Sequence, residues 1–355
     1  MVSPGKASPP KPAAGGACLL QIRSAPLLLF VAAVGIAGCA ADAPAERRTP
    51  DALTPQGSGA RIVFDEMVWH AAFGGAIFAL VLGLLIAILW RKRHNTEVPE
   101  DAEARGVRWI WLGGIVLPVG VLTVIFSQSL ASLASLDDLA EPDSLAVEVI
   151  GHRWWWEVHY PDEGIVTANE LRIPAGEPVQ LTLTSNDVIH TFWVPELHPK
   201  LDLLPGQANE LWLESDRPGT YRGICAEFCG LQHARMQFLA VVMKPEDFDE
   251  WAQSRSEPPP PPTTAHEQRG QDLFMNNCAM CHAIDGTLAT GTIGPDLSDL
   301  AGRLSLAGGV YPNNTGNLSG WISDPQGMKP GALMPGTELD GDELQALLAY
   351  LEVLR

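Results

Sequence analysis

Two long apolar segments constrain the fold of this chain more than any other feature of its sequence. Residues 67–89 and 109–130 each supply the ~20 residues that an α-helix needs to cross the hydrocarbon core of a membrane. Two buried helices of a soluble domain are the alternative, but both segments lack a polar face and are bracketed by charge. We therefore expect a two-helix transmembrane hairpin over residues 67–130.

The charges around this hairpin indicate its orientation. Basic residues lie between the two segments, at Arg91, Lys92, Arg93, Arg105 and Arg108. Acidic residues lie at the outer ends, at Asp65, Glu66, Asp137 and Asp138. Because short cytoplasmic loops carry an excess of lysine and arginine, the connection is expected in the cytoplasm and everything after residue 137 on the exported side.

The N-terminus has the features of an export signal. A basic stretch precedes an apolar run at residues 25–38 that is too short to span a bilayer, so residues 1–38 are expected to be a signal peptide. The run ends in Ile-Ala-Gly-Cys, which resembles the lipobox of bacterial lipoproteins and makes Cys39 the candidate for lipidation. An ordinary signal peptide cleaved at a small residue is the alternative. In both cases residues 39–66 form an exported N-terminal segment.

A dense set of soft metal ligands lies between residues 225 and 236. The run Cys-Ala-Glu-Phe-Cys-Gly-Leu-Gln-His-Ala-Arg-Met contains Cys225, Cys229, His233 and Met236, and His190 is a further candidate upstream. Thiolate, thioether and imidazole groups favour copper or zinc over oxygen-preferring cations, and methionine is a poor zinc ligand. The sequence therefore predicts a copper site.

A second redox centre is predicted by the CxxCH run at Cys278, Cys281 and His282. In this motif both thiols bond the porphyrin of a c-type haem, and the histidine takes one axial position of the iron. Met328 and Met334 are candidates for the other axial position. Met334 is preferred because it precedes a proline in a stretch that resembles the distal methionine loop of class I cytochromes c. Two redox centres on one polypeptide imply electron transfer.

A proline run separates the two predicted centres. Residues 257–264 should form a stiff polyproline spacer between domains at residues 139–256 and 265–355. Before the spacer, alternating and β-branched patterns with turn residues between them predict a small β-sandwich, at 145–160, 178–184, 209–214 and 237–243. After the spacer, helical periodicity with capping residues predicts a compact helical domain, at 266–277 and 340–354.

The formal net charge of −19 argues against nucleic acid as a partner, because an acidic chain repels phosphate. The carboxylates either form a docking surface for a cationic electron carrier or simply a solvated surface. The solvated surface is favoured, because a donor domain is already tethered to the chain.

Together these motifs resemble one family. The lipobox-like signal, the membrane hairpin, Gly-His-Arg-Trp-Trp-Trp at 151–156, Ile-His-Thr-Phe-Trp-Val-Pro at 189–195, the ligand-rich loop and the CxxCH domain follow one another in the order of subunit II of bacterial haem-copper cytochrome c oxidases. The caa-type variant carries such a fused cytochrome c. The resemblance implies a cupredoxin-like sandwich with a dinuclear CuA centre and an all-α class I cytochrome c domain.

The resemblance also implies a role for individual residues. Cys225 and Cys229 would bridge two coppers, His190 and His233 would each bind one copper, Met236 would bind weakly, and Glu227 would bind through its backbone carbonyl. The side chain of Glu227 would also be a ligand of a magnesium site at the interface with subunit I. Trp154, the first aromatic residue after Gly-His-x, would be the point at which electrons reach CuA.

The implied function is electron input to a respiratory oxidase. Electrons would pass from the tethered haem c through CuA to a haem-copper subunit I, where oxygen is reduced to water and protons are translocated. The implied location is the bacterial plasma membrane, with both redox domains on the exported side. The implied partners are lipid, subunit I, other oxidase subunits, and a donor that is a soluble cytochrome c or an upstream respiratory complex.

One position departs from the family pattern. Many subunit II chains place a glutamate in a Glu-x-x-Trp pattern before the second membrane helix, at the mouth of a proton channel of subunit I. Residues 105–111 read Arg-Gly-Val-Arg-Trp-Ile-Trp, and Glu103 is only a weak substitute. The sequence therefore leaves open whether this subunit supplies a glutamate to that proton channel.

Two other functions compete with this one. A membrane-anchored electron-transfer or copper-handling protein without an oxidase partner is disfavoured by Met236, the tryptophan cluster and the fused haem, because copper delivery requires release of the metal. A quinol oxidase subunit II is disfavoured because such chains lack the copper ligands.

Reporter fusions test the orientation of the hairpin. A fusion at Thr96 should report the cytoplasm and a fusion at Asp143 the exported side, because the positive charges of the connection resist translocation. The opposite result would leave both predicted centres on the wrong side of the membrane for haem attachment, and the domain assignment would have to be withdrawn.

Overall fold

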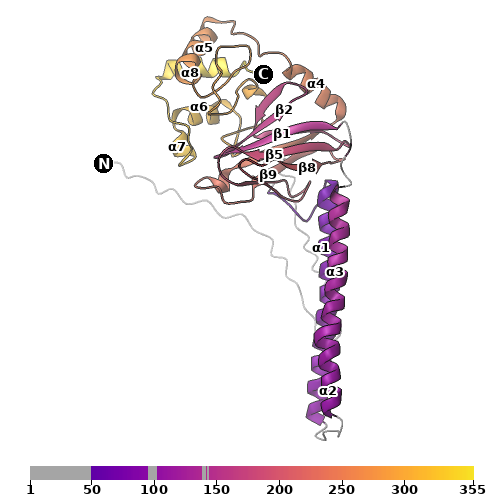
Figure 1. The fold of residues 1–355 in the computed structure, drawn as a ribbon. Helices are drawn as coiled ribbons and strands as arrows, with labels where there is room; N and C mark the ends of the chain where they lie inside the picture. Colours follow the sequence, from indigo (N-terminus) through magenta and orange to yellow (C-terminus); the bar gives the residue numbers. More distant parts are fainter. Residues whose placement is uncertain (1–48, 95–101, 138–140, 142–143) are drawn as a thin grey trace, which may run out of the picture. The chain divides into compact units, whose positions relative to one another are not determined.

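The computed structural model describes residues 49–94, 102–137, 141 and 144–355. Cys39 therefore lies outside the described residues. Along the described chain, long helices come first, then two β-sheets, then a group of shorter helices (Figure 1).

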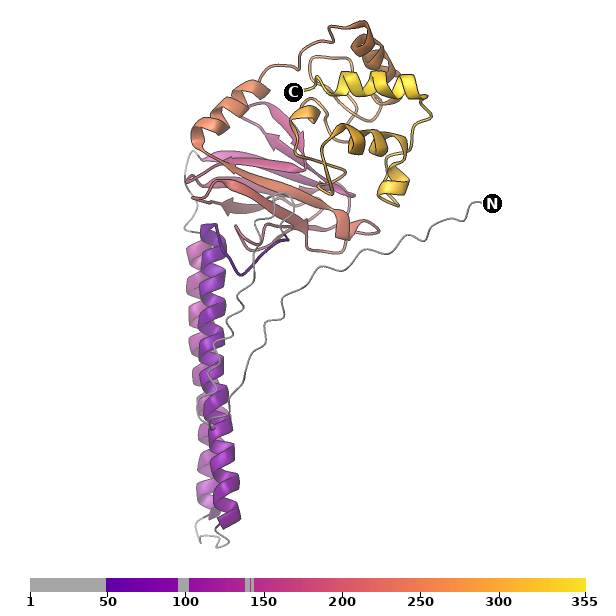
Figure 2. The same cartoon turned by 180° about the vertical axis from the view of Figure 1, so that it is seen from behind.

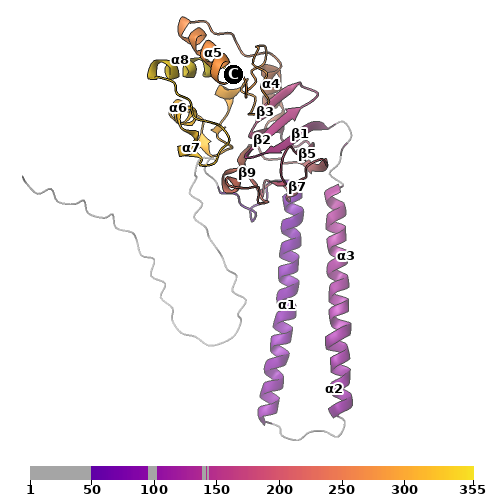
Figure 3. The same ribbon diagram turned by 60° about the vertical axis from the view of Figure 1, so that its left-hand side comes forward.

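The first part consists of two long helical segments. The first is α1 (Ser58–His94), and the second runs through α2 (Ala102–Trp111), a π-helical turn (Leu112–Val116) and α3 (Leu117–Asp137). Figures 1 and 3 show α1 and α3 side by side, and the hydroxyls of Ser129 and Ser132 both donate hydrogen bonds to the carboxylate of Glu66.

Both segments are long and apolar enough to cross a membrane. The spans are Ser58–Arg93 and Arg105–Leu136, and their most apolar 18-residue stretches have mean hydropathies of 2.7 and 2.2. Their most apolar windows are 0% buried against the rest of the described chain, which is not the behaviour of core helices in a soluble domain. Both helices are therefore candidate membrane spans.

The second part is a sandwich of two five-stranded sheets, in the orders β3-β2-β1-β5-β8 and β4-β10-β9-β6-β7. The strands are β1 (Leu145–His152), β2 (Trp155–Tyr160), β3 (Ile165–Ala168), β4 (Glu170–Pro174), β5 (Val179–Ser185), β6 (His190–Trp193), β7 (Leu201–Leu203), β8 (Asn209–Leu213), β9 (Gly219–Cys225) and β10 (Gln237–Met243). Alternate side chains of these strands fill the space between the sheets, where the rings of Phe192 and Phe238 stack at 4.6 Å. The predicted sandwich is confirmed.

The sequence pattern predicts strand structure throughout residues 145–160, but the structure has a turn within this segment. β1 and β2 form an antiparallel hairpin in which His152 pairs with Trp155, so Arg153 and Trp154 make the turn. Neither glycine nor proline marks this turn, and β-type residues continue through it, so the sequence pattern alone could not locate it. The hairpin places Trp154 at its tip.

A helix that the sequence pattern did not predict follows the sandwich. α4 (Pro245–Arg255) begins with a proline and two acidic residues in its first turn, which are typical of a helix N-terminus. Its Trp251 packs edge-on against Tyr160 of β2, with ring centroids 5.2 Å apart. The helix therefore extends the core of the sandwich before the chain leaves it.

The proline-rich residues 258–263 form neither helix nor strand and lead into the helical domain. Its elements are α5 (Ala265–Asn277), the short hairpin β11 (Ser305–Leu306) and β12 (Tyr311–Pro312), α6 (Thr315–Ser323), α7 (Pro325–Met328) and α8 (Gly341–Leu351). They appear in orange and yellow in Figure 2. Capping boxes at Thr264 and Asp340 start α5 and α8, as the sequence predicted.

α5 and α8 make the central contact of this domain. A Cβ on Gly270 of α5 would lie 2.0 Å from the carbonyl oxygen of Ala346 in α8, so glycine is what permits the close approach. Phe274 and Tyr350 pack edge-on beside it, with ring centroids 5.9 Å apart. The predicted helical domain is confirmed, and it also contains the short β11–β12 hairpin.

Candidate metal and haem centres

Three neighbouring strands position the predicted copper ligands. His190 begins β6 and Cys225 ends β9, and these strands pair directly, with Phe192 opposite Cys225. β10 pairs with β9 on its other side and begins one residue after Met236. The loop between β9 and β10 supplies the remaining ligands. Sheet pairing therefore gathers donors that are up to 46 positions apart, from residue 190 to residue 236.

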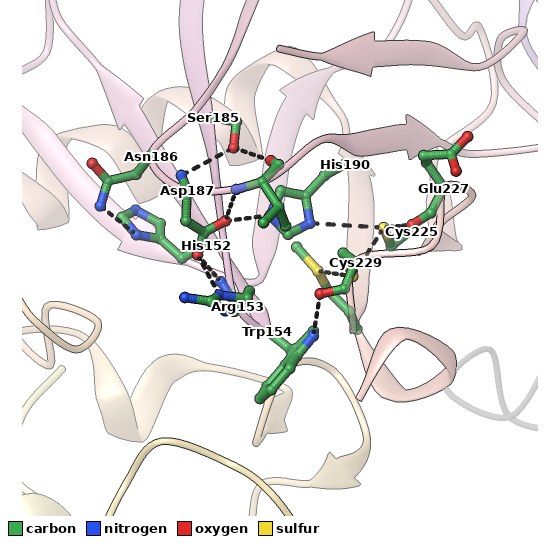
Figure 4. A network of polar contacts seen from close by, with 12 residues as sticks. His152, Arg153, Trp154, Ser185, Asn186, Asp187, His190, Cys225, Glu227 and Cys229 are labelled. Carbon is green, nitrogen blue, oxygen red and sulfur yellow. Dashed lines mark hydrogen bonds and ion pairs between the residues drawn. The ribbon is translucent and has the colours of Figure 1, made fainter. Parts of the chain in front are cut away.

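The donor atoms form a connected cluster, of which Figure 4 shows His190, Cys225 and Cys229. The Sγ atoms of Cys225 and Cys229 are 3.7 Å apart, and the Nδ1 of His190 is 3.9 Å from the Sγ of Cys225. On the other side, the Nδ1 of His233 and the Sδ of Met236 are 3.7 and 3.8 Å from the Sγ of Cys229. Two metal–ligand bonds of roughly 2 Å each can span such gaps, so this donor set fits copper.

The two residues of the Cys-x-x-x-Cys pair differ in acidity. A hydrogen bond with Cys229, and further contacts with His190 and with backbone groups, hold the pKa of Cys225 far below its usual range despite its burial. The same sulfur contact and burial raise the pKa of Cys229. Cys225 therefore loses its proton more readily than Cys229. The thiolate that results is the form of cysteine that binds metal.

Glu227 presents two different groups to its surroundings. Its backbone carbonyl lies 3.2 Å from the Sγ of Cys225, within the cluster. Its side chain is exposed and points away from the sulfurs (Figure 4), and its Oε1 accepts a hydrogen bond from the backbone N–H of Phe228. The carbonyl can therefore bind a metal of the cluster, while the carboxylate remains available to a second site.

Asp187 orients one of the histidines, and the sequence analysis did not identify it. Its Oδ1 lies 2.8 Å from the Nε2 of His190 and also accepts a hydrogen bond from the N–H of Val188. Its Oδ2 accepts one from the N–H of Arg153 at 2.8 Å. A carboxylate at Nε2 holds the ring proton there and leaves the Nδ1 lone pair for a metal. An acidic residue three positions before a predicted histidine ligand was the available clue.

Trp154 touches the copper loop from the tip of the β1–β2 hairpin. It is buried, and its indole N–H donates a hydrogen bond of 3.0 Å to the carbonyl of Cys229. Gly230 has a φ of +119°, and a Cβ there would lie 3.0 Å from the indole ring. A side chain at this position would strain the backbone and push on Trp154, so the glycine of the loop motif has a structural reason.

The C-terminal domain contains two adjoining hollows that share Cys278, His282 and Met334 in their walls. The walls of the first are mainly apolar, with Phe274, Leu297, Leu300, Leu318, Ile322 and Leu347. The second also includes Cys281, and from the sandwich Trp154 and Trp155. The Nδ1 of His282 lies 2.8 Å from the carbonyl of Pro295, which leaves Nε2 free for a metal. These residues fit a covalently attached haem.

The two methionine candidates lie in different places. Among the described residues, Met334 lines both hollows, whereas Met328 lines neither and packs its sulfur against Gly320. The geometry therefore favours Met334 as the distal ligand.

Replacing Asp187 tests how His190 is held. Asp187→Asn should weaken copper binding by about 10- to 100-fold while keeping the sulfur-to-copper absorption, because it changes the group that orients His190 and removes no ligand. A chelator competition on the full chain in detergent measures this affinity. Asp216→Asn, at an exposed residue that pairs with Arg61, is the control. Equal affinities in both variants would show that Asp187 does not orient the site.

Replacing the two methionines tests the distal ligand. Met334→Leu should change the absorption of the reduced haem and its reduction potential, because the thioether is lost from the iron. Met328→Leu, at the methionine outside the hollows, should leave both unchanged. A spectral change in Met328→Leu with none in Met334→Leu would reverse the assignment.

Comparisons with known proteins agree with these two centres. Residues 164–244 match the model of the family described as "Cytochrome C oxidase subunit II, periplasmic domain", and residues 267–355 match the cytochrome c family. The chain is 33% identical over 313 residues to cytochrome c oxidase subunit 2 of Alkalihalophilus pseudofirmus, covering 86% of this chain and 90% of that one.

Two further relatives are similar over most of their length. Cytochrome c oxidase subunit 2 of Bacillus sp. strain PS3 is 32% identical over 287 residues, covering 75% of this chain and 79% of the relative. That of Bacillus subtilis is 30% identical over 295 residues, covering 78% and 83%. With the matched domains and the cluster of His190, Cys225 and Cys229, these similarities show that the chain belongs to the cytochrome c oxidase subunit II family and carries a fused cytochrome c domain.

Proposed function

We propose that this electron-transfer subunit accepts electrons at its C-terminal domain and delivers them, through the loop at 225–236, to the oxygen-reducing subunit I. The observation that carries the proposal is the position of Trp154. Trp154 lines the haem hollow, and its indole N–H donates to the carbonyl of Cys229 in the copper loop. One side chain therefore contacts both sites.

The ligands are divided between the two domains. Two coppers would be held by His190, Cys225, Cys229, His233, Met236 and the carbonyl of Glu227, and one haem c by Cys278, Cys281, His282 and Met334. When bound, these groups supply reversible one-electron chemistry.

The protein contributes a rigid ligand frame. The Sγ of Cys225, the Sγ of Cys229 and a ring nitrogen of His190 all lie within 4.8 Å of one another. The pairing of β6 with β9 fixes the backbone at His190 and Cys225, and the hydrogen bond with Asp187 fixes the ring of His190. Because little can move when the charge of the site changes, the barrier to electron transfer stays low.

The surface beside the copper loop supports docking on subunit I. Phe228 and Leu231 are 75% and 81% exposed, and Ile189 is exposed next to His190. An apolar surface of this kind around a site is typical of a protein interface. The exposed carboxylate of Glu227 lies in the same loop, and we propose that it contributes to an interfacial magnesium site whose other ligands come from subunit I.

The proposed location is the bacterial plasma membrane. The two apolar helices and the basic connection between them support a hairpin with both redox domains on the exported side. Lipid, subunit I and other oxidase subunits are the proposed permanent partners. A soluble cytochrome c or an upstream respiratory complex would supply electrons to the C-terminal domain.

The burial of the ligands disfavours a copper-delivery protein. His190, Cys225, Cys229 and Met236 are all buried, so a bound metal would be enclosed by the fold. A delivery protein must expose its metal to a recipient. The fully buried thioether of Met236 and imidazole of His190 would retain a bound metal, and an electron-transfer site requires such retention.

Flash reduction of the haem in the full chain tests the proposed function. The copper centre should then be reduced, seen as loss of its absorption band. The rate of this step should be independent of protein concentration, because both centres belong to one chain. Trp154→Phe should slow this step several-fold and leave both spectra intact, since the indole donates to Cys229 and supplies no metal ligand.

Trp155→Phe is the matched control, because Trp155 lines the same hollow but stacks on His152 instead of contacting the copper loop. A rate that rises with protein concentration would contradict transfer within the chain. Equal rates in the two tryptophan variants would reassign Trp154 to packing.

A further inference from the structure

Buried polar contacts hold the C-terminal domain against the sandwich. The hydroxyl of Thr167 donates to the carboxylate of Asp299 at 2.8 Å. The carboxylate of Glu170, which is 1% exposed, accepts hydrogen bonds from the N–H groups of Leu304 and Ser305 at 2.5 and 3.1 Å. Buried polar groups are costly unless they are paired. Each carboxylate also pairs with an arginine of its own domain, Glu170 with Arg172 and Asp299 with Arg303, but the hydrogen bonds given above cross to the other domain. The pairing therefore favours one fixed arrangement over a freely moving tether.

Lys329 is a buried basic residue of this interface and lines the hollow that contains His282 and Met334. Its side chain is 3% exposed, and its Nζ donates to the carbonyl of Trp154 at 3.0 Å and to the carbonyl of Ala307 at 2.9 Å. Burial, and then the charge of Arg235, lower the pKa of Lys329 to about 7. An amine at such a costly position is held there by its two carbonyl partners.

The position of Lys329 connects the two redox sites. It lies five residues before Met334 in the chain and lines the same hollow as Met334 and Trp154. The Nζ of Lys329 donates a hydrogen bond to the carbonyl of Trp154, and the indole N–H of Trp154 donates one to the carbonyl of Cys229. The methionine loop of one domain is thus joined to the ligand loop of the other through Trp154. Gln232 and Arg235 of the ligand loop also donate directly to the carbonyls of Pro330 and Met328 on either side of Lys329.

We propose that Lys329 is a positioning residue, which fixes the methionine loop against Trp154 so that electron transfer between the centres needs no rearrangement of the domains. The inference rests on the proposed function. In the step concerned, one electron leaves the centre of the C-terminal domain and the copper centre gains it. Lys329 exchanges no electron in this step, and its contribution is a constant distance.

Lys329→Met in the full chain tests this role. Methionine keeps a long unbranched side chain but cannot donate to the carbonyl of Trp154. The haem and copper spectra should remain those of the wild type, while the rate of copper reduction after flash reduction of the haem falls several-fold. The slower rate should also decrease as glycerol raises the solvent viscosity, because domain movement then limits it, whereas the wild-type rate should not.

Two further variants sharpen the test. Lys200→Met, at an exposed lysine of the sandwich, should behave as the wild type. Lys329→Gln retains an N–H donor on a shorter side chain and should restore part of the rate. If Lys329→Met does not accumulate with haem, the same rate and viscosity measurements are made on Lys329→Gln, which should be slower than the wild type.

The outcomes separate the two proposals. A Lys329→Met chain with the wild-type rate and no viscosity dependence would overturn the role of Lys329 and leave the proposed function standing. An altered haem or copper spectrum in that variant would also overturn it, because Lys329 would then act on a centre rather than on the distance. A wild-type chain in which flash-reduced haem never reduces copper would overturn both.

Discussion

The pairing of β6 with β9 is the constraint on which the copper site depends. It sets Phe192 opposite Cys225 and thereby brings the start of β6, with His190, beside the end of β9. β10 closes the loop from the other side of β9, so that Met236 returns to the same end of the sheet. A loop of this ligand content in an isolated peptide would have many conformations. In the sandwich both of its ends are fixed by backbone hydrogen bonds, and its ligands are therefore preorganised.

A second consequence of the sandwich is that its hairpin tip faces the haem hollow. Trp154 is placed by the turn between β1 and β2, and it is then held by Cys229 on one side and by Lys329 on the other. The proline spacer alone would allow the C-terminal domain to move. The buried contacts of Glu170 and Thr167 restrict that freedom, so the tether and the interface act together to keep the two centres near each other.

The sequence was sufficient for the family, the three-part architecture and the ligand types, because these are carried by local patterns: apolar length, strand alternation, capping boxes and the two cysteine motifs. It was not sufficient for Asp187 or Lys329. Lys329 acquires its role from a contact with a residue 175 positions away, and no local pattern reports such a contact. The Arg153–Trp154 turn was missed for a different reason, since no glycine or proline marks it. The motif resemblance singled out Trp154, but only the fold shows what it contacts.

The central claim is that two thiolates and two histidines of one loop-and-strand frame hold two coppers as a single redox unit. Metal analysis combined with electron paramagnetic resonance of the copper-loaded full chain tests it most directly. The account predicts two coppers per chain, with one unpaired electron shared equally between both nuclei and a near-infrared absorption band, all of which are lost in Cys225→Ser. One copper per chain, with the spectrum of a mononuclear blue or colourless site, would contradict it.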